Sequence, residues 1–80
     1  MADYWHLEGF DQESEQMVVD VVLRGLTDRE LGDLFDRPAA DPLLGDWVVT
    51  VHQSAEIERL TGLSLDLEKC IYYVGRRRGL

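Results

Sequence analysis

Apolar and polar side chains nearly alternate from Tyr4 to Phe10, and a β-branched segment runs from Met17 to Leu23. Alternation with a period of two and β-branched residues are typical of strands. Residues 11–16 between them are wholly polar, which predicts a turn and an antiparallel hairpin. The residues of the second strand predicted to face the core are Met17, Val19, Val21 and Leu23.

Two later segments carry helix signals. Thr27 and Glu30 have the spacing of a capping box, and apolar residues follow at helical spacing, namely Leu31, Leu34 and Phe35. A second helix is predicted over residues 55–61, with Ser54 as its N-cap and Gly62 just beyond its end.

Two further apolar runs, Trp47–His52 and Cys70–Val74, predict a third and a fourth strand. Residues 36–46 contain Pro38 and Pro42 and are predicted to form a loop, whereas residues 76–80 are expected to be a flexible basic tail.

The resulting order is ββαβαβ in one domain that covers residues 1–80. We expect an α+β fold in which a largely antiparallel four-stranded sheet carries both short helices on one face. The opposite face would then be uncovered and more apolar than a solvated face requires. The residues predicted to lie on it are Tyr4, His6, Val18, Val22, Val48, Thr50, Ile71 and Tyr73.

Charge is spread unevenly along the chain. Residues 1–68 hold all 16 acidic residues and four basic ones, a net charge of −12, and residues 69–80 hold four basic residues. Such a body repels nucleic acid and attracts a basic protein partner. The alternative is that the acidic surface serves only solubility. A chain with a single cysteine and without a signal-like or membrane-spanning run is expected in the cytoplasm.

Candidate chemistry is sparse. His6, His52 and Lys69 share no spacing rule that would join them in catalysis, and scattered glycines form no nucleotide-binding motif. The loop acids Asp36, Asp41 and Asp46 lack the spacing of a calcium loop, and Cys70 resembles a small buried hydrophobe. We therefore predict no catalytic residue, cofactor or metal site, and a protein that is not an enzyme.

Two kinds of residue are candidates for partner binding. Acidic residues cluster in the first turn and in the first helix, and these are Asp11, Glu13, Glu15, Asp28, Glu30 and Asp33. The uncovered face adds possible anchors, namely Tyr4, Val18, Val22 and Tyr73.

Four stretches together resemble a family of small bacterial α+β domains of unknown function: residues 10–15, 25–35 and 41–43, and Leu65-Asp66-Leu67 before Tyr72-Tyr73. Some members of that family resemble immunity proteins encoded beside polymorphic toxins. The resemblance implies a compact domain that neutralises a toxin by occupying its active or substrate-binding surface, and the charge favours a basic nuclease toxin. The alternative is a homodimeric structural or regulatory module that uses the uncovered face.

Overall fold

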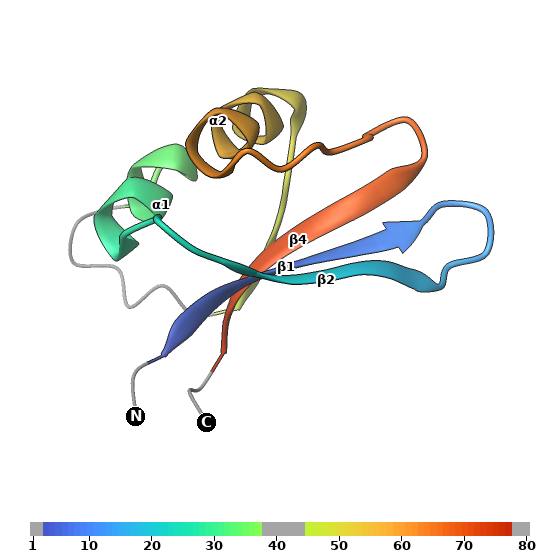
Figure 1. Cartoon of the computed structure of the whole chain (residues 1–80), viewed down its shortest axis with the longest axis horizontal. Coiled ribbons are helices and arrows are strands. Elements are labelled where there is room, and N and C mark those ends of the chain that lie inside the picture. The colour runs from blue at the N-terminus through green and yellow to red at the C-terminus, as the bar shows by residue number, and fades with distance from the viewer. Residues whose placement is uncertain (1–2, 38–44, 78–80) are drawn as a thin grey trace.

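The computed structural model describes residues 3–37 and 45–77 and has the predicted ββαβαβ order (Figure 1). Its sheet is antiparallel throughout, with the strand order β2-β1-β4-β3. The elements are β1 (Tyr4–Asp11), β2 (Met17–Leu23), α1 (Asp28–Leu34), β3 (Asp46–Val48), α2 (Val51–Thr61) and β4 (Cys70–Arg77). The predicted α+β class and the two helices on one face are confirmed (Figure 1).

The first hairpin has the predicted bounds at β2, but its first strand, β1, continues one residue past the predicted Phe10 to Asp11. Its turn is held by Asp11, whose carboxylate accepts hydrogen bonds from the backbone amides of Glu13 and Ser14 at 2.8 and 2.9 Å. A shift in register between Gly9 and Phe10 places Met17, not Val18, opposite Phe10. The bulge explains why Met17 is exposed although the strict period of two predicted it to face the core.

Helix α1 begins at the predicted capping box. The Glu30 amide donates to the Thr27 hydroxyl at 3.1 Å, and the Glu30 carboxylate accepts from the Thr27 amide at 3.0 Å. Leu31 is fully buried, and the Phe35 ring packs 5.0 Å from the ring of Trp47. This short helix therefore docks on the sheet through the side chains that its spacing singled out.

The prediction of a strand over residues 47–52 is wrong beyond Val48. The Val49 amide still donates to the Tyr72 carbonyl at 2.9 Å, but Thr50 is the N-cap of α2 and the helix begins at Val51. The Gln53 side-chain oxygen accepts from both the Thr50 amide and the Thr50 hydroxyl at 2.9 Å. This local capping overrides the strand propensity of Val51.

Ser54 was expected to cap α2 but lies inside it, where its hydroxyl donates to the Val51 carbonyl. The end of the helix is as predicted, because Gly62 takes a left-handed conformation with φ of 79° and its amide donates to the Glu58 carbonyl.

Strand β4 extends to Arg77, so the expected flexible tail is wrong at Arg76 and Arg77. Pairing with β1 holds these two residues, Arg76 opposite Trp5 and Arg77 opposite Tyr4. The remaining tail residues 78–80 lie outside the described part of the chain, as do Pro38, Asp41 and Pro42 of the predicted loop.

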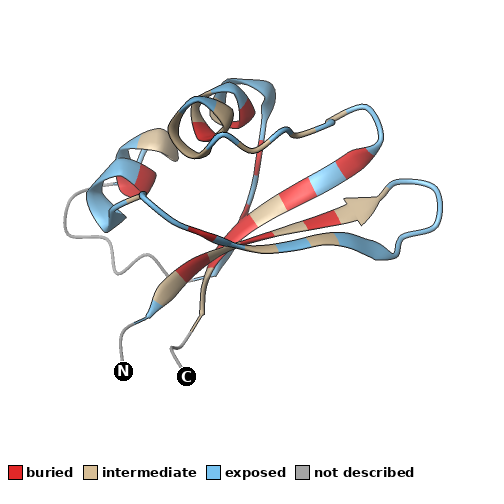
Figure 2. Cartoon of the chain, in the orientation of Figure 1, coloured by how far each residue is buried: buried red, intermediate tan, exposed pale blue. Residues whose placement is uncertain are grey.

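The core lies between the sheet and the two helices (Figure 2). Alternate residues of the central strands point into it, and the Trp5 and Trp47 rings meet there at 5.6 Å. Cys70 is buried, as the sequence predicted, and both tryptophans are buried as well. The buried apolar residues are Trp5, Leu7, Leu23, Leu31, Trp47, Val49, Ile57, Cys70, Tyr72 and Val74.

Gly9 offers a test of how tightly this layer packs. A Cβ atom at Gly9 would lie 2.7 Å from Cε1 of Tyr72 and 3.0 Å from Cβ of Val19. We expect Gly9→Ala to lower the free energy of unfolding by about 1–3 kcal/mol, since the crowded ring has to move. Urea denaturation measures it. Val51→Ala, at a position that is 75% exposed, is the control and should change stability by less than about 0.5 kcal/mol.

Candidate partner-binding face

The face of the sheet opposite the helices carries the strand side chains that alternate with the core residues and point away from the core. We call it the open face, and it includes Tyr4, His6, Glu8 and Phe10 of β1. Large apolar side chains are exposed on or beside it: Val18 (57%), Val22 (41%), Val48 (53%) and Ile71 (41%). Thr50, predicted to lie there, instead caps α2. The exposed valines and Ile71 thus leave apolar surface on this face that no described helix covers.

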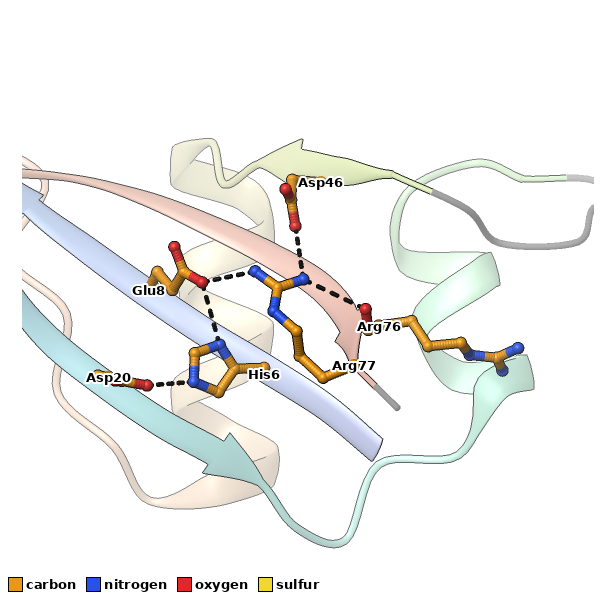
Figure 3. A network of polar contacts seen from close by, with 6 residues as sticks. All are labelled: His6, Glu8, Asp20, Asp46, Arg76 and Arg77. Carbon is orange, nitrogen blue, oxygen red and sulfur yellow. Dashed lines mark hydrogen bonds and ion pairs between the residues drawn. The ribbon is translucent and has the colours of Figure 1, made fainter. Parts of the chain in front are cut away.

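A chain of polar contacts crosses the open face from β2 to β3 (Figure 3). His6 contacts the Asp20 carboxylate on one side, and its Nδ1 lies 3.4 Å from Oε1 of Glu8 on the other. That longer contact is not a hydrogen bond, so the buried Nδ1 has no hydrogen-bond partner among the described residues. Arg77 continues the chain, donating to Glu8 at 2.5 Å and to Asp46 at 3.1 Å.

Gly75 makes room for the last of these contacts. It lies opposite Asp46 in the β3–β4 pair, and a Cβ atom there would collide with the Asp46 carboxylate and the Arg77 guanidinium. The hydrogen bonds that Arg77 donates to Glu8 and then to Asp46 raise the pKa of its guanidinium above the ordinary value. The guanidinium thus joins three strands and stays charged.

Beside this network the open face is hollowed by a pocket of about 540 Å³. Its walls combine carboxylates with apolar and aromatic side chains, and the rings of Phe10 and Tyr73 meet edge to face with centroids 5.9 Å apart. Aromatic rings beside carboxylates suit the side chain of a lysine or an arginine. The lining residues are Glu8, Phe10, Asp11, Gln12, Glu15, Asp46, Ile71 and Tyr73.

The acidic cluster of the first turn borders this pocket, but its members differ in role. Asp11 holds the turn, and the amides of Ser14 and then Glu13 lower the pKa of its carboxyl group. Glu13 and Glu15 are exposed, and their carboxylates bond to no other described residue. Of this cluster, Glu13 and Glu15 are therefore the residues with charge to offer a partner.

The second acidic cluster lies on α1, on the helix side of the sheet, and is not brought together with the first (Figure 1). Asp28 accepts from Trp5 Nε1 at 2.7 Å and pairs with Arg76, whereas Glu30 belongs to the capping box. Asp33 is exposed. Two of the three acids thus stabilise the fold directly.

The other candidate constellations are not assembled. His6 lies on the open face and His52 on α2, behind the sheet. Asp46 is paired with Arg77, and Asp41 lies outside the described residues. Within residues 3–37 and 45–77, no group of three or more His, Cys, Asp or Glu side chains is placed to hold a metal ion.

Sequence reasoning missed Glu8, Phe10 and Arg77 as residues of this face. The alternation in the sequence could have identified Glu8 and Phe10, because every second residue of a strand lies on the same face and both continue the series that begins with Tyr4 and His6. For Arg77 the basic run looked like a tail, and only the pairing with β1 shows that it belongs to the sheet.

Residues 4–75 match the family described as a domain of unknown function, DUF7683. The chain belongs to this family. The resemblance to a small-domain family of unknown function is thereby confirmed, and DUF7683 itself assigns no activity. No curated protein matches the sequence. In the described ranges, each helix is too short or too polar to cross a bilayer.

The Asp28–Arg76 pair predicts a pH dependence of stability. The hydrogen bond from Arg76, and then that from Trp5, lowers the pKa of Asp28 below its ordinary 3.8. A lowered folded-state pKa stabilises the fold above the unfolded pKa, and this contribution is lost as the pH falls through the folded value. Because the Asp28 side chain is 61% exposed, solvent screening keeps the contribution small.

We therefore expect Asp28→Asn to cost less than about 1 kcal/mol at pH 7, and this cost should shrink as the pH falls below the ordinary pKa of 3.8. Urea denaturation across this range measures the difference. Asp33→Asn is the control, and an equal loss in both variants, or a loss that persists in acid, would contradict the assignment.

Proposed function

We propose that this domain is a cytoplasmic, immunity-type binding protein that blocks a toxin by covering its active or substrate-binding surface with the open face. The observation that carries the proposal is the pocket in which carboxylates and aromatic rings line one cavity beside exposed valines and Ile71. Interfaces of this kind combine apolar anchors with polar rims.

The favoured partner is a basic protein, and a nuclease toxin is the class that fits best. A nuclease binds phosphates with lysines and arginines, and an acidic protein surface imitates that substrate. A net charge of −8 on 80 residues also steers a cationic partner toward encounter. On this view Glu13 and Glu15 act during approach, and Tyr73 and Phe10 pack against the side chain that enters the pocket.

The second candidate function is a homodimer that stacks two open faces. The exposed Val22, Val48 and Ile71 favour it. The same stacking would bring together carboxylates of like charge, namely Glu8, Glu15 and Asp46 from both copies, around Arg77 of each copy. Like charges at a buried interface are costly, so we favour a partner of opposite charge.

The test begins with capture of the basic toxin from the source organism and measures its association with three variants. Glu15→Lys should slow association by about three- to tenfold at low salt, and the effect should shrink as salt shortens the Debye length. Tyr73→Ala should speed dissociation by about tenfold or more, since it removes an aromatic anchor. Asp33→Lys makes the same charge change on the helix side and should change either rate by less than about twofold.

Inhibition is measured separately. Cells that express the captured toxin should survive when the wild-type domain is co-expressed and should stop growing with Tyr73→Ala, with protein levels matched. A neutral or acidic partner would contradict the proposal. A larger effect of Asp33→Lys than of Glu15→Lys would also contradict it, because that result would place the contact at α1.

A further inference from the structure

Strand β2 forms an open edge of the sheet. It is the first strand in the order β2-β1-β4-β3 and pairs only with β1 among the described strands. Strand β2 is seven residues long, and its residues Val18, Asp20 and Val22 are exposed. An unpaired edge of this length presents backbone donors and acceptors that pair readily with another strand.

The hydrogen bonds of the neighbouring strands fix which residues of β2 face outward. The Gln12 amide donates to the carbonyl of Lys69, the residue just before β4. Even-numbered residues of β1 therefore form their backbone hydrogen bonds with β4, and odd-numbered residues form theirs with β2. The pairs Leu7–Val21 and Trp5–Leu23 therefore exchange the β1–β2 bonds. Asp20 and Val22 alternate with them, so their amides and carbonyls point away from the sheet.

The outward-facing residues are complementary to themselves when the strand is reversed. Around a two-fold axis at Val22, an antiparallel copy places Val22 opposite Val22 and Asp20 opposite Arg24, which directly follows the strand. All of these residues have even numbers, so each pair is in phase to exchange two backbone hydrogen bonds. In an extended chain Asp20 and Arg24 also share one face, which places opposite charges directly across from each other.

We propose that two copies of this chain pair through β2 in this register to form one continuous antiparallel sheet. Such a two-fold axis stands perpendicular to the sheet, so the helices of both copies lie on one side and both open faces on the other. The inference is independent of the proposed toxin binding, because it uses the edge of β2 and leaves the pocket of the open face free.

Hydrogen exchange of the full chain tests the pairing without a substitution. In about 0.15 M salt, where the Debye length is about 8 Å, the amides of Asp20, Val22 and Arg24 should exchange rapidly at micromolar protein concentration. At about 100 µM their exchange should slow by at least about tenfold as the second copy binds them. The amides of Val21 and Leu23 face β1 and should be protected equally at both concentrations.

Charge variants test the register. Sedimentation should show that Arg24→Asp raises the dimer dissociation constant by about tenfold or more, because it sets carboxylates opposite each other. The exchanged pair Asp20→Arg with Arg24→Asp should return the constant to within about threefold of the wild type. Arg29→Asp, on the exposed surface of α1, carries the same charge change as Arg24→Asp and should leave the dimer intact. Circular dichroism checks that each variant folds.

A wild-type chain that stays monomeric at about 100 µM would overturn the proposal. A dimer in which the hydrogen exchange of the outward amides of β2 does not depend on protein concentration would also overturn it. That result would place the contact elsewhere, for example between two stacked open faces. If the exchanged pair folds and remains monomeric while exchange shows β2 to be protected, the stated register is wrong.

Discussion

The burial of one face of the sheet is the constraint on which the rest of this structure depends. The side chains of Trp5 and Leu7 in the central strand β1 point into the core, and the helices cover that side (Figure 2). Two short helices are too few to cover a four-stranded sheet on both sides, so His6, Glu8 and the residues beside them remain outside. The surface proposed to bind a partner is thus a direct consequence of how the core is formed.

Two consecutive arginines at the end of β4, Arg76 and Arg77, point to opposite faces of the sheet. Arg76 points to the helix side, where its guanidinium lies 5.1 Å from the Trp5 ring centroid and pairs with Asp28. Arg77 points to the open face and joins Glu8 to Asp46 (Figure 3). The last residues of β4 therefore tie α1 to the sheet on one side and β3 to β1 on the other. The basic residues at this end of the chain neutralise part of its acidic body.

The sequence was sufficient to predict what depends on local pattern. The bounds of β2, the capping box at Thr27 and the glycine at the end of α2 all follow from spacing within a few residues. The errors arose where two local signals competed, as at Val51, or where distant pairing decided the outcome, as at Arg76 and Arg77.

Some features of the candidate site could likewise be predicted from local pattern, whereas others depend on the pairing of distant strands. Alternation placed Tyr4, Val22 and Tyr73 on the open face. The pocket also needs Glu8 beside Tyr73 and Asp46 near Arg77, and these neighbours follow from the strand order β1-β4-β3. Several orders were compatible with the strand pattern, so only the folded sheet shows which carboxylates share a cavity.

The most direct test of the open face uses the two isoleucines of the chain, because Ile71 lines the pocket and Ile57 of α2 is fully buried in the core. Isoleucine methyl groups are labelled, and a blocked hexa-arginine peptide is added to about 1 mM. The account predicts that the Ile71 methyl signal shifts saturably, that the Ile57 signal stays in place, and that Glu15→Lys weakens the response. An unchanged Ile71 signal, or an equal shift of both signals, would contradict it.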